Sequence, residues 1–314
     1  MVTTVFHAGE RALQQQAGVA DRLAELGPQL IRSAMPVQHQ RFFEGLPFVV
    51  AAGLDRQGQP WASALAGPPG FVVAPAADQL VVRARLGAGD PLAEAWHPGA
   101  PFGLLGMEPA TRRRNRANGQ VLSAAADGYT LAVQQSFGNC PKYIRARAPH
   151  WHGPGPAPVW ERRGALNDAD RQWIRHADTC FIASAHPQAG RSLNVAEGVD
   201  VSHRGGRPGF IRVDDDGLLT LPDFSGNHYF NTLGNVVLNP RVGLLFIDFA
   251  AGDLLWVAAA AQLIVDGPAL AAFDGALRLL KLQPTAVIRA ARALPLQWDD
   301  GEASPAVAAT GTWL

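Results

Sequence analysis

The segment RFFEGLPFVVAAGLDRQGQPWASALAGPPGFVV, residues Arg41–Val73, decides the fold because a similar segment occurs again later in the chain. The second copy, RQWIRHADTCFIASAHPQAGRSLNVAEG…RPGFIRV, spans Arg171–Val213. Each copy starts with a helix-like stretch, continues as an apolar run and reaches the same PGF sequence after a Gly- and Pro-containing turn. Similarity at a long period indicates a duplicated structural unit. We therefore predict two copies of one unit in this chain.

The resemblance between the halves continues beyond these segments. HPGAPFGLLGME (97–108) parallels NPRVGLLFID (239–248), and RRRNRANGQVL (112–122) parallels LLWVAAAAQLI (254–264). Strand-like runs follow at 128–135 and 276–283. Many short strands separated by Gly, Pro and Asp turns are typical of small antiparallel barrels. We expect short helices at 36–45 and 91–97 in the first half, and at 168–177, after an Asn167 N-cap, and 227–238 in the second.

These patterns predict a mainly β (α+β) fold of two tandem six-stranded antiparallel split β-barrels that form a pseudo-dimer within one chain. An N-terminal helical segment covers residues 1–35, with a helix at 10–34 that breaks near Gly27–Pro28. The first barrel spans 36–146, a Pro/Gly-rich connector 147–166 and the second barrel 167–298. Residues 299–314 are expected to form a weakly ordered tail.

The totals narrow the class of protein. The chain has 314 residues, with 27 Lys+Arg and 27 Asp+Glu. A zero net charge argues against a dedicated nucleic-acid or acidic-membrane binder, because such proteins carry a basic excess. The two cysteines, Cys140 and Cys180, are far apart and suggest neither a disulfide framework nor a metal site. Without a signal-like or membrane-length apolar segment, we expect a cytoplasmic protein.

The halves differ first at SHRGGRPGF (202–210), which corresponds to AGPPGF in the first half and reads as a polar insert. Arg204 and Arg207 have the fork geometry that suits phosphate or carboxylate, and Gly205–Gly206 allow a ligand to approach the main chain. The alternative is a solvated hairpin tip. Ser202 begins the stretch, and His203 is a weak candidate for a general acid or base.

The second difference is FSGNHYFNTLGN (224–235). On a helix, Asn227, Asn231 and Asn235 lie on one face, and the helix N-terminus favours an anion. The first half has no Asn there and carries Asp90, which would repel an anion. The alternative is that these Asn side chains cap the helix or contact the neighbouring half.

At the third difference it is the first half that carries the polar segments, RRRNRANG (112–119) and SFGNCPKYI (136–144). On a strand, Arg112, Arg114 and Arg116 share a face that either is solvated or lines an anion site. The turn after it brings Ser136, Asn139 and Lys142 close together. Because each half contributes different polar segments, we predict one composite site for an anionic ligand between the halves.

These four motifs, taken in order, resemble the pyridoxamine 5'-phosphate oxidase-like FMN-binding split barrels, and most closely the tandem version that often precedes a ferredoxin-reductase module. The resemblance covers roughly residues 37–298 and implies FMN bound between two barrels. In simpler members, a Ser-Arg-Lys run holds the FMN phosphate. That run falls on Phe230, Asn231 and Thr232 here, so the cations are absent from it. RRNRANG (113–119) matches the family's RQVRxxG strand and implies that Arg114 and Arg116 face the flavin or the substrate.

The resemblance implies an FMN-dependent oxidoreductase for a small molecule; the alternative is a non-catalytic flavin carrier or sensor. No dinucleotide fingerprint and no iron–sulfur cysteine pattern is present in the sequence, so electrons would come from a separate reductase or from NAD(P)H. Lys142 or an Arg of 112–116 would tune the flavin, and the Gly205–Gly206 backbone or the Ser136 hydroxyl would donate near its N5 atom. No metal or nucleic acid is expected, and a homodimer is compatible with the family.

Overall fold

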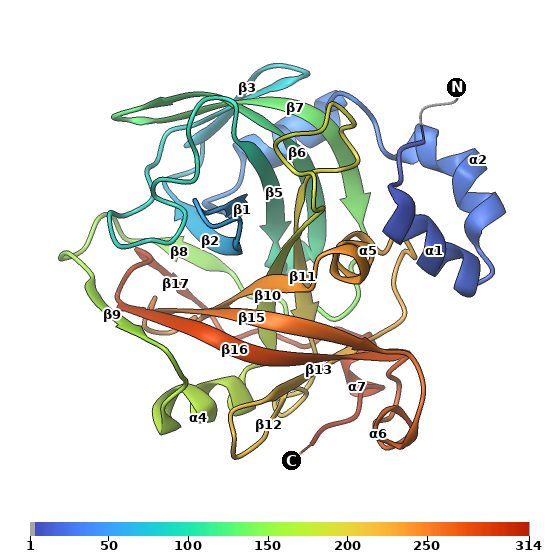
Figure 1. Cartoon of the computed structure of the whole chain (residues 1–314). Helices are drawn as coiled ribbons and strands as arrows, with labels where there is room; N and C mark the ends of the chain where they lie inside the picture. Colours follow the sequence, from blue (N-terminus) through green and yellow to red (C-terminus); the bar gives the residue numbers. More distant parts are fainter. Residues whose placement is uncertain (1–3, 314) are drawn as a thin grey trace.

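The computed structural model describes residues 4–313 and contains two antiparallel sheets with the same strand order (Figure 1). The first sheet runs β2-β1-β5-β6-β7-β4-β3 and the second β11-β10-β14-β15-β16-β13-β12. Each strand of the second sheet therefore occupies the same position as the first-sheet strand whose number is nine lower, so that β10 corresponds to β1 and β15 to β6. The mainly β, internally repeated organisation agrees with the sequence, but each sheet has seven strands on this path rather than six.

The strand bounds follow the apolar runs of the sequence. The first sheet consists of β1 (Phe48–Leu54), β2 (Pro60–Ala66), β3 (Val72–Ala76), β4 (Gln79–Val82), β5 (Pro101–Glu108), β6 (Arg113–Ala125) and β7 (Gly128–Asn139). The second consists of β10 (Thr179–Ala185), β11 (Val199–Gly205), β12 (Arg212–Val213), β13 (Leu219–Asp223), β14 (Arg241–Ile247), β15 (Leu254–Ile264) and β16 (Arg278–Ala291). β9 (Val159–Arg163) adds to β16, and β8 (Pro149–Trp151) pairs with β17 (Leu296–Trp298).

The helices lie around the sheets. They are α1 (Ala8–Gln16), α2 (Ala20–Leu30), α3 (Val37–Glu44), α4 (Asp168–His176), α5 (Asn231–Leu238), α6 (Pro268–Ala271) and α7 (Pro305–Ala308), with a 3-10 turn at Pro109–Thr111. The helices expected at 36–45 and 168–177 are confirmed as α3 and α4, and Asn167 caps α4 through the backbone N–H of Asp170. No helix among residues 4–313 combines the length and the apolar character that a membrane span needs.

Three expectations about helices are wrong. Residues 91–97 form turns rather than a helix. The helix expected at 227–238 begins only at Asn231, because Phe230 has left-handed backbone (φ 62°) and cannot be part of it. The N-terminal helix breaks at Ala17–Val19, where Gly18 has φ 67°, whereas Pro28 is accommodated inside α2.

The segment that reads as an insert is not one. β2 and β11 have seven residues each, pair over their whole lengths with β1 and β10, and lead into GPPGF and GRPGF respectively. SHRG therefore replaces SALA position by position. The additional residues of the second half lie one loop earlier, at 186–198, where the first half has only 55–59.

In each sheet, a glycine on a central strand lies directly against an edge strand of the other sheet. A Cβ atom on Gly103 of β5 would lie 2.7 Å from the Val199 carbonyl oxygen, at the start of β11. One on Gly243 of β14 would lie 2.2 Å from the Pro60 carbonyl oxygen, at the start of β2. β11 packs on β5 and β1, and β2 packs on β14 and β10. The contacts between the sheets are therefore reciprocal.

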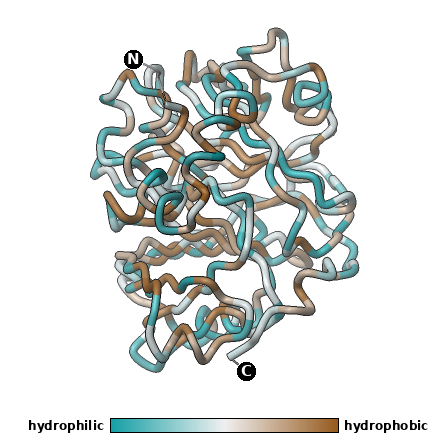
Figure 2. The backbone as a smooth tube through the Cα atoms, turned by 90° about the vertical axis from the view of Figure 1, so that its right-hand side faces the viewer, coloured by the Kyte–Doolittle hydropathy of each residue, from teal (hydrophilic) through white to brown (hydrophobic). Residues whose placement is uncertain are grey.

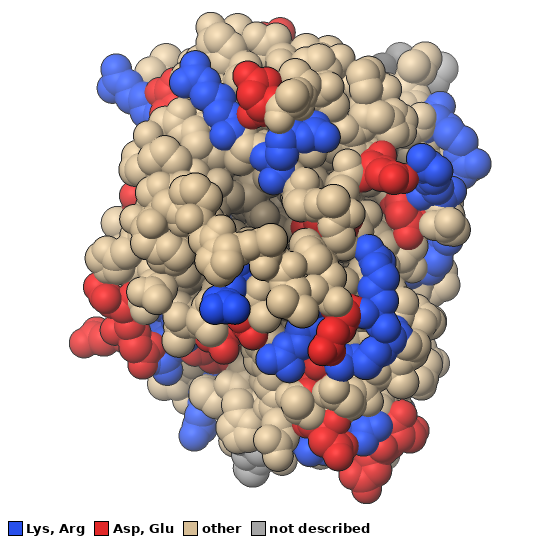
Figure 3. Space-filling model, turned by 90° about the vertical axis from the view of Figure 1, so that its left-hand side faces the viewer, with Lys and Arg blue, Asp and Glu red and all other residues tan. Residues whose placement is uncertain are grey.

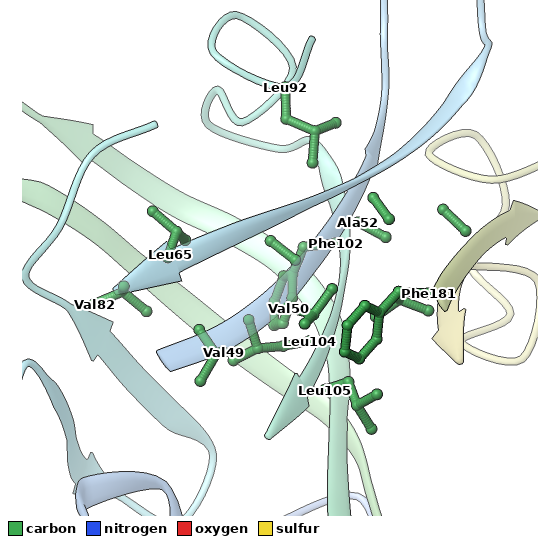
Figure 4. Packing of buried hydrophobic residues seen from close by; sticks show 14 of the residues in the cluster. Val49, Val50, Ala52, Leu65, Val82, Leu92, Phe102, Leu104, Leu105 and Phe181 are labelled. Atoms are coloured by element: carbon green, nitrogen blue, oxygen red, sulfur yellow. The ribbon is translucent and has the colours of Figure 1, made fainter. Parts of the chain in front are cut away.

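The largest hydrophobic cluster joins the two sheets. It combines β1, β2 and β5 side chains with Phe181 of β10 and Trp256 of β15, both fully buried. Figure 4 shows Phe181 pointing into the group that contains Val50, Leu104 and Leu105. Hydrophobic segments run through the middle of the molecule in Figure 2. Positive and negative side chains are intermixed on the face seen in Figure 3. The two halves share this cluster, and the second half has a further cluster of its own around Ile182 and Phe246.

The chain end packs on both halves rather than forming a loose tail. The backbone N–H of Trp313 donates to the Gly209 carbonyl (2.8 Å), and its ring lies 4.7 Å from that of Phe273. Ser304 N–H donates to the Ile144 carbonyl.

Gly243→Ala and Gly103→Ala should each lower the free energy of unfolding by about 1–3 kcal/mol, because the added methyl group collides with backbone that cannot move aside. Gly155→Ala is the control, since an added Cβ meets nothing within 4 Å there. Urea unfolding measures all three. Equal stability of the three variants would contradict the packing described above.

Candidate functional site

A pocket lies where the two halves meet, and both halves supply its walls. The first half contributes β6 and the segment 139–143; the second contributes the end of β11, residues 222–233 and the start of β16. The pocket encloses about 900 Å³, the open solvent at its mouth included.

Arg116 forms the buried floor of the pocket. Its Nη1 atom donates to Asp200 Oδ1 (3.0 Å) and to Asn231 Oδ1 (2.8 Å), and its Nη2 atom donates to Ser202 Oγ (2.7 Å). Asp200 also accepts from Asn118 Nδ2 and Asn235 Nδ2. A single guanidinium from the first half thus fixes a strand and a helix of the second half.

The N-terminal helix extends this network. Asn231 Nδ2 donates to Glu10 Oε1 (2.5 Å), and Glu10 Oε2 accepts the His7 backbone N–H (2.8 Å). Burial, together with the nearby Asp200 carboxylate, raises the pKa of Glu10 well above its usual value. Helix α1 reaches this position because Gly9 and Gly234 allow α1 and α5 to touch backbone to backbone.

A second buried pair joins Arg114 and His203. Arg114 Nη1 lies 3.2 Å from His203 Nδ1, and Arg114 also donates to the Cys140 carbonyl. Because an arginine can only donate, Nδ1 accepts and the ring proton is on Nε2. Nε2 is buried and has no partner among residues 4–313. Burial and the neighbouring Arg114 and Arg204 lower the pKa of His203 well below its usual value, so the ring is neutral at physiological pH.

Further cations lie toward the mouth of the pocket. Asp223 is shared by Arg204 and Arg278, so one carboxylate faces two guanidiniums. Lys142 is exposed and has no hydrogen-bond or ion-pair partner within the described chain. The buried Asn139 Nδ2 is a further unpaired donor in residues 4–313. The walls therefore present N–H groups in excess of acceptors, which suits an anionic ligand.

Backbone strain concentrates at the same place. Five non-glycine residues of the described chain have positive φ, and three of these, Tyr143, His228 and Phe230, line the pocket. The Tyr143 hydroxyl donates to the Ser225 carbonyl (3.1 Å), which ties the two halves together over the pocket. Strained backbone of this kind is often found at ligand sites.

The structure brings most of the sequence-predicted residues to this pocket. The following line it: Arg114, Arg116, Asn139, Lys142, Ser202, His203, Arg204, Gly205, Asn227, Asn231 and Thr232. Their proximity agrees with a composite arrangement, while their roles in binding stay a prediction. Asn227 lies before α5, in the loop, where its side chain accepts the Tyr229 N–H.

Five predicted residues lie elsewhere. Arg112 ends the 3-10 turn in left-handed backbone, so it does not share a face with Arg114 and donates to the Ile144 carbonyl. Ser136 is buried against His39 (2.8 Å). Asn235 lies beneath the pocket, on Ser184 and Asp200. Gly206 packs against the Phe210 ring, and Arg207 is exposed.

Gly205 lines the pocket for a different reason from the one expected. A Cβ atom there would lie 2.0 Å from the Tyr143 carbonyl oxygen. The glycine therefore makes room for backbone of the other half, and no direct approach of a ligand to its main chain is needed to explain it.

Sequence reasoning missed Glu10, Asp200, Asp223, Arg278 and Tyr143. Glu10 had a local signal, because His7 and Glu10 form a capping box. Asp200 lies between the fully buried Val199 and Val201, where a carboxylate is unusual. Asp223 and Arg278 are neighbours because β13 pairs with β16, and Tyr143 joins them only through the packing of the two halves.

Comparisons with known proteins gave similarity to solved structures only; no protein-family model and no curated protein matches the sequence. A candidate pyridoxamine 5'-phosphate oxidase from Lactobacillus delbrueckii is 16% identical over 40% of this chain and 94% of its own (TM-score 0.31). The heme storage protein HutZ from Vibrio cholerae is 14% identical over 40% and 95% (TM-score 0.27). HupZ from Group A Streptococcus is 8% identical over 39% and 92% (TM-score 0.30). The fold described here rests on strand order and register, independently of these matches.

Asp200→Ala should lower the free energy of unfolding by about 3–5 kcal/mol, because it removes the acceptor on which a buried guanidinium and two amides converge. Chemical denaturation measures the change. Asp168→Ala, at an almost fully exposed carboxylate, is the control and should stay within experimental error of the parent. Similar values for both variants would show that the network adds little to stability.

Proposed function

We propose that the pocket between the two sheets binds FMN, and that the chain is a pseudo-dimer of split barrels acting as an FMN-dependent oxidoreductase on a small molecule. The observation that supports this most directly is the excess of fixed donors on the walls. Arg114, Lys142, Arg204 and the His203 Nε2–H surround a space that holds the single carboxylate of Asp223. A phosphate-bearing cofactor supplies acceptors for Lys142 and for the His203 Nε2–H, which have none among the described residues, and a second anion for Arg204, which shares Asp223 with Arg278.

The residues present fit such a cofactor in two respects. Lys142, Arg204 and Arg278 lie toward the mouth and would hold the phosphate, in place of cations on α5. Tyr143, Phe224 and Phe230 provide flat apolar surface for a ring system, and Tyr143 and Phe224 already pack against each other at 5.0 Å.

When bound, FMN supplies the electron transfer, and the chain sets the environment in which this happens. Arg114 is held rigidly by the Cys140 carbonyl and His203. A fixed buried cation favours the form of a ligand that carries more negative charge. His203 is a neutral donor through Nε2 and would hydrogen-bond to a carbonyl or ring nitrogen of the ligand.

The decisive experiment is to purify the protein and identify what it releases on denaturation. Release of FMN, or reconstitution of the colourless protein with FMN at one molecule per chain, is expected. Bleaching of the bound flavin by NADH, NADPH or a reductase, followed by reoxidation with a small-molecule acceptor or air, distinguishes an oxidoreductase from a carrier. A chain that can neither retain nor take up FMN would contradict the proposal.

The same purification also tests for haem, since haem and flavin have different absorption spectra. His203 gives no support to haem, because its Nε2 atom carries the ring proton and so has no lone pair for iron.

Lys142→Met should raise the Kd for FMN roughly tenfold, because it removes an unpaired ammonium from the mouth of the pocket. Lys281→Met is a matched control, since these are the only two lysines in the sequence and Lys281 lies outside the pocket. Fluorescence titration at low and high salt measures both. Identical affinities would remove Lys142 from the site.

A further inference from the structure

The duplication gives the pocket a counterpart in the other half. Gly103 and Gly243 are equivalent, and they pair with Asn118 and Ala258 respectively. A β-bulge follows directly in both copies, between Asn118 and Gly119 and between Ala258 and Ala259. Asn118 of β6 and Ala258 of β15 are therefore equivalent. Counting two residues back from each, Arg116 corresponds to Trp256.

The edge strands extend this equivalence. Ser202 pairs with Ile182, which pairs with Leu244; Ser63 pairs with Ala51, which pairs with Leu104. Leu104 and Leu244 follow the two equivalent glycines, so Ser63 corresponds to Ser202. The counterpart of the pocket, called here the mirror cleft, is therefore bounded by Ser63, Trp256 and the loop 83–100.

The indole of Trp160 fills the mirror cleft. This residue comes from β9, at the end of the connector, and stacks on Trp256 with ring centroids 5.5 Å apart and planes 23° apart. Gly87 and Gly89 contact it so closely that a Cβ on Gly89 would lie 2.2 Å from the Trp160 ring. The Arg162 side chain donates to the Gly89 carbonyl (2.7 Å) and holds the loop on the strand.

The chemistry of the mirror cleft differs from that of the pocket. Where Ser202 bonds to Arg116 and Thr232, Ser63 donates to the buried carboxyl group of Asp90. Asp90 is also the residue expected from the sequence to repel an anion, and it lies inside the protein. Trp256 Nε1 is buried and has no partner among the described residues. No guanidinium stands in the place of Arg116; Arg162 lies near Asp90 but is held on the Gly89 carbonyl.

We propose that the mirror cleft is a second binding site whose ligand space is taken by Trp160, and that it accepts a flat, uncharged aromatic molecule when this side chain is removed. Trp160 thereby leaves only one of these two equivalent sites open. The inference rests on strand register and packing, and it holds whether or not the open pocket takes FMN.

Trp160→Ala, with indole added, tests the proposal. Loss of the side chain should lower the Tm, and indole at millimolar concentration should raise the Tm of the variant by roughly 2 °C or more. The unsubstituted protein should not respond, because its cleft is full. Trp173→Ala is the matched control, since Trp173 is also half-buried but packs against the separate hydrophobic cluster of the second half and under Arg289.

Gly89→Ala provides an independent measurement. In the parent protein the added methyl group meets the indole of Trp160, so Gly89→Ala should raise the equilibrium constant for unfolding. In the Trp160→Ala background the same substitution should raise that constant by a factor at least several-fold smaller. If Trp160→Ala does not fold, Trp160→Leu replaces it in both experiments. An equal cost of Gly89→Ala in the two backgrounds, or an indole response that is absent or no larger than that of Trp173→Ala, would overturn the proposal.

Discussion

The reciprocal packing of edge strands on Gly103 and Gly243 is the constraint on which the rest of the structure depends. Side chains at these positions would keep the sheets apart, and glycine lets backbone of one half lie directly on the other. This contact brings β6 beside β11, so that Arg116 reaches Asp200 and Ser202. The polar pocket and the shared hydrophobic core are both consequences of the same close approach.

The two clefts show how one backbone arrangement can hold different chemistry. One pair of equivalent positions carries Arg116 in the pocket and Trp256 in the mirror cleft. The other pair carries a serine in each, Ser202 in the pocket and Ser63 in the mirror cleft. In the pocket, buried charge is balanced by a network that includes Glu10 from the N-terminal helix. In the mirror cleft, apolar stacking of Trp160 removes the space itself. Duplication supplied two sites, and side-chain replacement made them unequal.

Much of the fold could be predicted, because it depends on local patterns. The apolar runs became strands, Asn167 capped α4 and the repeat became two sheets of identical order. The two wrong helix boundaries also have local causes. Left-handed backbone at Phe230 makes α5 start later than predicted, and the N-terminal helix breaks at Gly18 rather than near Gly27. Within the site, most of the Arg and Asn residues singled out from the sequence line one pocket, and their roles there stay a prediction. Arg112 and Ser136 lie elsewhere, because the first residue of a strand and a buried hydroxyl cannot be recognised from spacing.

The sequence by itself determined the duplication, the β class and the asymmetry between the halves, because each is written in residue order and polarity. Only the tertiary structure decided which polar groups face one pocket and which are buried beneath it. Asp223 meets Arg204 and Arg278, and Asn231 meets Glu10, across separations of 19 to 221 residues. Such contacts arise from the packing of two sheets and an added helix, and no local pattern encodes the distance at which two remote side chains come to lie.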